Sequence, residues 1–230
     1  MIQLIDTVFD LDTASQAIAE LNAFLADHQE IEETGAAGLQ QFFYARPSLL
    51  LLAGECFGPP SFLASAYAPE FSVFREFRAD FAIANKERDK FLFVEFEAAK
   101  RDSVFSVKHS GKSSISYEWA KPFEHGYSQL VDWHYLMDDM ERTSRFQEHF
   151  GVDRVSYDGL LVIGRDSFVN EAGCSRRLRW RKDKTVVNSR RLHCLTFDAL
   201  ANEIQGRYET YAMRDASNRS LAEVIDDPIQ

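Results

Sequence analysis

Apolar residues recur at helical spacing near the start of the chain. Thr13-Ala-Ser-Gln16 has the form of a capping box, and the apolar positions around it lie three or four residues apart: Ala14, Ala17, Ile18, Leu21, Phe24 and Leu25. This spacing predicts an amphipathic first helix. A second helix is predicted over residues 36–44, ending near Arg46-Pro47, because the residue before a proline is disfavoured in a helix. Residues 54–60 are expected to form a turn-rich connector.

The pattern changes after residue 71, where Phe and Val become frequent. Segments 71–78, 79–85 and 90–98 are predicted to be consecutive strands, with a charged turn at residues 85–89 before the last of them. Residues 108–117 are polar and show no period, which favours an exposed loop that is available to a ligand.

The second half of the chain alternates helices and strands. After Pro122, apolar residues at three- and four-residue steps predict a long helix that packs across the sheet. The continuous apolar run at 157–164 predicts a strand covered on both faces. A further strand is predicted at 191–197, and a closing helix at 198–213.

These elements predict an α/β fold, an α+β mixed sheet with flanking helices. A helical N-terminal segment is expected over residues 1–60, packed on a core domain over residues 61–213. Residues 214–230 are polar and are expected to form a flexible tail.

Three acidic residues fall on two neighbouring predicted strands. Successive side chains of a strand alternate between its faces, so Glu95 and Glu97 point to one side while Val94 and Phe96 point to the other. Asp80 lies in the preceding strand, and antiparallel pairing around the charged turn would bring it close to Glu95 or Glu97.

Such a group of acids calls for a cation or for raised pKa values, because like charges facing each other across strands are destabilising. Carboxylate oxygens suit Mg²⁺ or Mn²⁺, which can activate water and stabilise charge on a phosphoryl group. The sequence therefore predicts a metal centre at Asp80, Glu95 and Glu97, with Lys100 holding the attacking water or neutralising the phosphate. The alternative is that the three carboxylates form a solvated sheet face.

Composition narrows the class of protein. The 230 residues, 45% of them hydrophobic, suit one compact domain or one domain with a small appendage. No apolar run approaches the roughly 20 residues of a membrane span, and residues 1–12 lack a basic region before their apolar positions. A cytoplasmic protein without membrane association is therefore expected. Cys56, Cys174 and Cys194 are far apart and in no CxxC pair, which favours reduced thiols.

The formal net charge of -10 argues against indiscriminate binding to nucleic acid. Basic residues nevertheless crowd one short segment: Arg176, Arg177, Arg179, Arg181, Lys182, Lys184, Arg190 and Arg191. Because Leu178 and Trp180 are interleaved with them, the segment could grip a phosphate backbone and stack a base, with Arg177 and Arg181 as contacts. The alternative is a solvated helix face or a subunit contact. Lys108 and Lys112 of the polar segment are further candidates for contact with DNA.

A stripe of three side chains lies along the predicted long helix. His125, Gln129 and Trp133 are one helical turn apart and would lie over the acidic strands. Gln129 would orient a ligand or water there; the alternative is a helix-to-sheet hydrogen bond, with Trp133 in the core. The histidines fall in no spaced zinc signature and are assigned no chemistry. No P-loop, GxGxxG or GxSxG motif is present, so nucleotide-binding and serine-hydrolase functions have no support.

Several segments resemble, in their order and spacing, the central block of the Shedu anti-phage defence nucleases: Phe42–Leu50, Phe91–Glu97, Val104–Ser106, His125–Trp133, Gly159–Arg165 and Leu195–Leu200. The resemblance spans roughly residues 36 to 213. It implies a restriction-endonuclease-like core of the PD-(D/E)XK type that acts on DNA, and homo-oligomers. It also implies that Asp80 and Glu95 bind metal and that Gln129 supports the site.

One position departs from the PD-(D/E)XK pattern, which places Lys two residues after the strand glutamate. Glu97 stands there, and this resembles a minority of restriction endonucleases that carry Glu; alternatively, Lys100 supplies the amine from a shifted position. A DNA endonuclease of anti-phage defence is the first hypothesis. A catalytically inactive module that keeps the nuclease fold to bind DNA or a protein partner is the second. The third is an assembly protein whose basic segment joins subunits.

Overall fold

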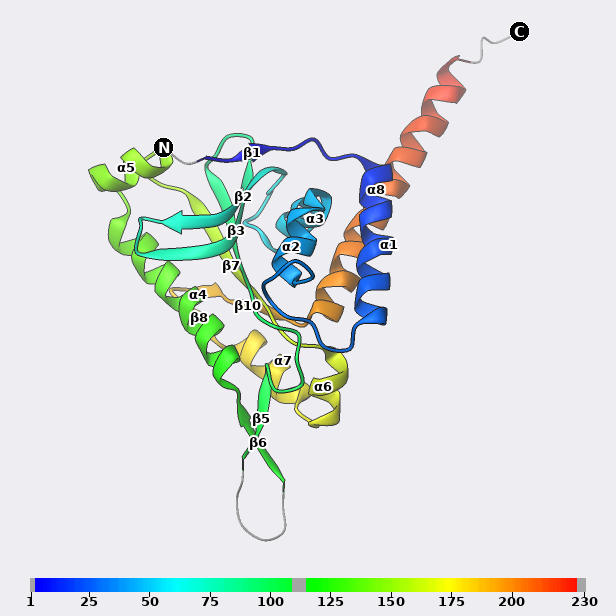
Figure 1. Ribbon diagram of the computed structural model, residues 1–230. Helices are drawn as coiled ribbons and strands as arrows, with labels where there is room; N and C mark the ends of the chain where they lie inside the picture. Colours follow the sequence, from blue (N-terminus) through cyan, green and yellow to red (C-terminus); the bar gives the residue numbers. More distant parts are fainter. Residues whose placement is uncertain (1–2, 109–114, 227–230) are drawn as a thin grey trace.

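A twisted sheet of six strands forms the centre of the molecule (Figure 1), in a computed structural model that describes residues 3–108 and 115–226. Its strand order is β1-β2-β3-β4-β7-β10. The strands are β1 (Ile5–Asp6), β2 (Ala64–Val73), β3 (Phe77–Asn85), β4 (Lys90–Phe96), β7 (Ser156–Val162) and β10 (His193–Leu195). Strands β1 to β4 run antiparallel to their neighbours, whereas β4, β7 and β10 are parallel. The predicted mixed α/β fold is confirmed.

Helices cover both faces of this sheet (Figure 1). One face packs on α1 (Leu11–Asp27), α3 (Pro47–Phe57) and the first turns of α8 (Phe197–Asp226), with the short α2 (Leu39–Tyr44) beside them. The other face packs on α4 (Lys121–Met140) and α5 (Ser144–Phe150). No helix within the described ranges is both long enough and apolar enough to cross a membrane.

Smaller elements lie at one end of the molecule. Strands β5 (Phe105–Lys108) and β6 (Ser116–Trp119) form a hairpin that projects from the body at the bottom of Figure 1. Helices α6 (Asp166–Glu171) and α7 (Ser175–Lys184) lie above its base, followed by the short pair β8 (Val186–Val187) and β9 (Arg190–Arg191).

The side-chain alternation predicted for β4 is confirmed. Val94 and Phe96 belong to the core on the α1, α3 and α8 side, whereas Phe91 and Phe93 belong to the core on the α4 side. Odd-numbered positions of β4 therefore face α4. This parity directs Glu95 toward the long helix and away from the larger helical layer.

Five local features differ from the sequence-based expectation. The expected strand 71–78 is divided, because residues 71–73 end β2, residues 74–76 form a turn and residues 77–78 begin β3. Helix α1 begins earlier, because Asp10 Oδ1 accepts the Thr13 N–H at 2.8 Å and acts as the N-cap. Helix α3 was not expected; its run Leu49–Ala53 is buried on all sides, so the sequence shows no helical period there. The ends of the expected loop 108–117 belong to the hairpin, and helix α8 continues through Asp226, beyond the expected end at 213.

Candidate active site

Asp80 and Glu95 lie opposite each other on β3 and β4. The last paired positions of the two strands are Phe81 and Val94, and one further step in the same register places Asp80 across from Glu95. Glu95 is 6% exposed and Glu97 8%, and Asp80 is partly buried. The alternative of a solvated acidic sheet face is therefore excluded.

Asp80 is held by two donors. Its Oδ2 accepts the backbone N–H of Phe96 at 2.7 Å, and its Oδ1 accepts Gln40 Nε2 at 2.6 Å. Burial raises the pKa of Asp80 to about 6 despite these hydrogen bonds, which lower it, and the charge of Glu97 adds to the rise. This carboxyl is therefore poised to ionise slightly below neutral pH.

A fourth carboxyl group, Glu33, joins the three that the sequence pattern predicts. Gln40 Nε2 also donates to Glu33 Oε1, at 3.1 Å, so one amide links Glu33 and Asp80. Burial, followed by the charges of Asp80 and Glu97, raises the pKa of Glu33 to about 7. We call Glu33, Asp80, Glu95 and Glu97 the acidic centre.

The position of Glu33 depends on a single contact between distant parts of the chain. An isolated antiparallel bridge pairs Ile31 with Ala99, so the loop before α2 lies beside the residues that follow β4. Glu33 stands in a charged loop without periodicity, and no signal in the sequence indicated its role. Sequence reasoning therefore missed it.

Glu95 is the most perturbed member of the acidic centre. Its Oε1 accepts Gln129 Nε2 at 2.7 Å, whereas its Oε2 is buried and has no hydrogen-bond partner among the described residues. Burial raises the pKa of Glu95 to about 9, and the charges of Asp80, Glu97 and Glu33 contribute to the rise. A buried carboxyl oxygen without a donor is costly unless it is protonated or meets a cation.

Helix α4 supplies the polar partners of the two glutamates. His125 Nδ1 lies 3.0 Å from Glu97 Oε1, and Gln129 lies one turn further along the helix. Burial raises the pKa of Glu97, and the hydrogen bond from His125 opposes that shift. Trp133, the third residue of the predicted stripe, is buried in the core. The structure thus shows the alternative given for Gln129, a helix-to-sheet hydrogen bond, and its acceptor is a carboxyl group of the acidic centre.

Gly126 allows α4 to lie this close to the sheet. A Cβ atom at this position would meet Leu161 Cδ1 at 2.6 Å and Glu97 Cγ at 3.2 Å. Distances below about 3 Å are not tolerated without movement, so any larger residue would push the helix or Glu97 away.

Lys100 does not contact the acidic centre within the described ranges. Lys100, on the loop that follows β4, pairs through its Nζ with Oε1 of Glu32, on the loop before α2, at 2.6 Å. Hydrogen bonding to Glu32 raises the pKa of Lys100. Lys100, which was expected beside the metal, is thus paired with Glu32 instead. His125 is an ionisable residue that does contact the acidic centre, through Glu97.

The acidic centre fits a hard divalent cation by the chemistry of its donors. The four carboxyl groups are close enough to interact electrostatically, and Glu95 Oε2 is buried without a donor among the described residues. In the described part of the chain, no three His, Cys, Asp or Glu residues form a group that could hold a metal ion. The side chains of the acidic centre are therefore not arranged around a common point. Asp80 and Glu95 instead accept hydrogen bonds from neutral donors. Their carboxyl oxygens are of the hard type that Mg²⁺ or Mn²⁺ prefers.

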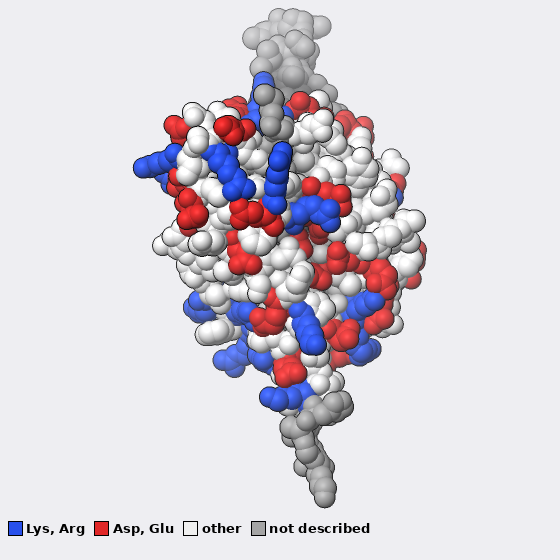
Figure 2. Space-filling view, turned by 60° about the vertical axis from the view of Figure 1, so that its left-hand side comes forward, with Lys and Arg blue, Asp and Glu red and all other residues white. Residues whose placement is uncertain are grey.

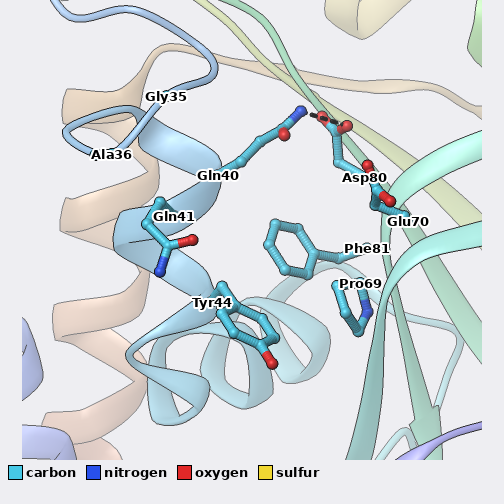
Figure 3. A pocket seen from close by; sticks show the side chains of 9 residues that line it. All are labelled: Gly35, Ala36, Gln40, Gln41, Tyr44, Pro69, Glu70, Asp80 and Phe81. Carbon is cyan, nitrogen blue, oxygen red and sulfur yellow. Dashed lines mark hydrogen bonds between the residues drawn. The ribbon is translucent and has the colours of Figure 1, made fainter.

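A hollow of about 450 Å³ leads from the surface to Asp80 (Figure 3). Gln40, Gln41 and Tyr44 of α2 form one wall, and the opposite wall comes from β2 and β3, with Glu70 beside Asp80. Of the four residues of the acidic centre, Asp80 is the one that lines this hollow, between α2 and β2.

The residues predicted to contact DNA differ in their exposure and in the partners that they contact. Lys108 is exposed, 4.0 Å from Glu118, and Lys112 lies outside the described residues. Arg177 donates to Tyr117 O at 2.7 Å, and Arg181 forms two hydrogen bonds with Glu124. Arg177 thus braces the hairpin, whereas Arg181 ties α7 to the first turn of α4. Figure 2 shows Lys and Arg side chains in the lower part of the face, interspersed with acidic ones.

Comparison with known protein families identifies a match for most of the chain. The family described as Shedu protein SduA, C-terminal, matches residues 36–201, which is more than half of the chain. Glu33 lies just before the matched residues, whereas Asp80, Glu95, Glu97, His125 and Gln129 lie within them. No curated protein matches the chain.

Proposed function

We propose that this chain, which belongs to the Shedu SduA C-terminal family, is a metal-dependent DNA endonuclease. The family is one of anti-phage defence. The observation that carries the proposal is the buried acidic centre, in which Glu95 keeps one oxygen without a donor while three other carboxyl groups surround it.

Asp80 and Glu95 would hold Mg²⁺ or Mn²⁺, with Glu97 as a third ligand. The bound cation would lower the pKa of a water molecule and stabilise charge on the phosphate that is attacked. Glu33, linked to Asp80 through Gln40, adds negative charge that favours a divalent cation at this point. Gln129 would orient Glu95, and His125, which contacts Glu97, would be placed to accept or donate a proton beside the metal ligands.

DNA would reach the acidic centre through the hollow beside Asp80. The acidic centre repels anions. A phosphate can therefore approach it only where cations and neutral amide groups offset that repulsion. Cleavage is therefore expected to depend strictly on a divalent metal, and to fall at high salt as contacts with Lys and Arg weaken.

A second function is favoured by one specific observation. The position that the superfamily gives to lysine is Glu97, and Lys100 pairs with Glu32. A module that keeps the fold but binds DNA or a protein without cleaving it would have these features. Such a module would not bind Mn²⁺ in a manner that depends on Glu95.

The test is conversion of supercoiled plasmid DNA by the purified protein with Mg²⁺ or Mn²⁺. Asp80→Asn and Glu95→Gln are the matched variants, because each keeps the size of the side chain and removes its charge. The proposal expects nicking by the wild type and its loss in both variants. Equal nicking by all three proteins would exclude the acidic centre, and binding of DNA without nicking would favour the inactive module.

A further inference from the structure

A second hollow lies between α7 and the base of the hairpin, apart from the acidic centre. Its volume is about 750 Å³, within the range of small-molecule sites. Two tryptophans and three arginines line it: Trp119, Trp180, Arg176, Arg177 and Arg181. We call this hollow the α7 groove.

The aromatic residues of the α7 groove have different environments. Trp119 is fixed, with its ring 4.5 Å from both Phe105 and Phe123. Trp180 is 64% exposed, and its indole packs on no other ring among the described residues. A large flat side chain in solvent, on the wall of a hollow, is a ready stacking surface.

The arginines of the α7 groove also divide into two kinds. Arg181 is neutralised by Glu124 and stacks on Trp119, with its guanidinium carbon 4.7 Å from the ring centroid. Arg177 is fixed over the same ring at 5.3 Å but has no carboxylate partner within the described ranges. Arg176 and Arg179 are exposed and form no ion pair within the described part of the chain. The groove thus carries net positive charge on a chain of net charge -10.

Flat aromatic faces beside unpaired guanidinium groups suit a ligand that is both aromatic and anionic, which is the chemistry of a nucleotide. A nucleotide within a duplex cannot offer its base, because both faces of the base are already stacked. An unpaired strand exposes base faces and phosphates together. The α7 groove is therefore suited to single-stranded DNA rather than to a duplex.

The α7 groove is linked to the acidic centre through the first turn of α4. Glu124, which holds Arg181, is followed by His125, which contacts Glu97. We propose that the α7 groove binds an unpaired segment of the DNA strand, with a base stacked on Trp180 and phosphates held by Arg176 and Arg177. This assignment rests on the proposed nuclease function for its biological meaning, but the binding itself does not require cleavage.

The test measures binding of labelled oligonucleotides to the full chain in the Glu95→Gln background without metal, so that cleavage cannot occur. A single strand, the matching duplex and a mononucleotide are compared by fluorescence anisotropy. Trp180→Ala and Arg176→Glu are the variants, and Tyr135→Ala, which removes an aromatic residue 65% exposed on α4, is the matched control.

The single strand is expected to bind more tightly than the duplex. Trp180→Ala is expected to weaken its binding by about tenfold, as loss of one stacked base does, and Arg176→Glu by a similar factor, while Tyr135→Ala changes nothing. Single-strand binding that is unaffected by Trp180→Ala and Arg176→Glu would overturn the proposal. Binding of the mononucleotide alone, dependent on Trp180, would overturn it in favour of a free nucleotide. If the wild type fails to nick plasmid but single-strand binding depends on Trp180, the groove assignment holds and the nuclease function fails.

Discussion

Gln129 donates its amide to Glu95 Oε1 over 2.7 Å, and this contact joins the long helix α4 to the acidic strand β4. The donor is neutral, so it stabilises one oxygen of Glu95 without cancelling the charge of the carboxylate. The other oxygen is left without a donor. Gln129 therefore orients Glu95 and leaves it able to accept a cation.

Replacing Gln129 tests that relationship. The hydrogen bond from Gln129 lowers the pKa of Glu95, so Gln129→Leu should raise this pKa further and shift metal binding to higher pH. The affinity for Mn²⁺ should fall by about tenfold or more, as is usual for loss of a group that orients a metal ligand. Calorimetric titration with Mn²⁺ across a pH series measures both effects. Gln205→Leu is the control, because Gln205 lies in α8 and donates to Glu209, away from the acidic centre. An equal response of both variants would contradict the role of Gln129.

The stability of the metal-free protein should fall as pH rises above neutral. The pKa of Glu95 is about 9 in the folded chain, above its ordinary value of 4.5. The folded state therefore keeps a proton that the unfolded state releases, and this contribution is lost as pH rises through about 9. Urea unfolding with a chelator at about pH 7 and about pH 9 should show a larger loss for wild type than for Glu95→Gln. An equal loss in the two proteins would mean that Glu95 is ionised at neutral pH.

Two glycines on helices provide a matched test of how closely α4 packs. Gly206 in α8 has no atom within 4 Å of an added Cβ, so Gly206→Ala should raise the free energy of unfolding by about 1 kcal/mol through helix propensity. Gly126→Ala gains the same propensity but meets Leu161 and Glu97, which costs about 1–3 kcal/mol. Urea unfolding of the two variants measures the difference. Gly126→Ala should also weaken Mn²⁺ binding, and equal stabilisation by the two changes would show that α4 is not held against the sheet.

Lys100 and His125 are expected to differ in their importance for cleavage. Lys100 forms a half-exposed ion pair with Glu32, and such pairs contribute little, so Lys100→Met should change the nicking rate by less than about threefold. His125→Ala removes the partner of Glu97 and should lower the rate by at least about tenfold. Rates of plasmid nicking at saturating Mg²⁺ measure both. A large loss of nicking rate in Lys100→Met, with little change in His125→Ala, would show that Lys100 supplies the catalytic amine.

Much of the sheet and three of the four residues of the acidic centre could be predicted from the sequence, because they depend on local rules. The alternation of side chains in β4 predicted that Glu95 and Val94 point to opposite faces of the sheet. The charged turn after β3 predicted the register that brings Asp80 opposite Glu95. Glu33 could not be predicted, since one bridge between Ile31 and Ala99 positions its loop. No sequence pattern encodes such a contact.

The basic segment shows a second limit of sequence reasoning. Its composition predicts positive charge but not which face of α7 meets the protein. Arg181 turns inward to Glu124 and Arg177 to the hairpin, whereas Arg176 and Arg179 face solvent. Arg177 and Arg181 were predicted from the sequence to contact DNA. Only the packing of α7 shows that these two arginines contact the protein while their neighbours face solvent.

The most direct test of the acidic centre is a crystal structure of the wild type grown with Mn²⁺, with anomalous scattering recorded at the manganese edge. The account predicts an anomalous peak between Asp80 and Glu95, with Glu95 Oε2 among the atoms nearest to it. The account would be contradicted if Mn²⁺ supported plasmid nicking but the crystal showed no anomalous peak beside these two residues and Glu95 still bonded to Gln129 alone.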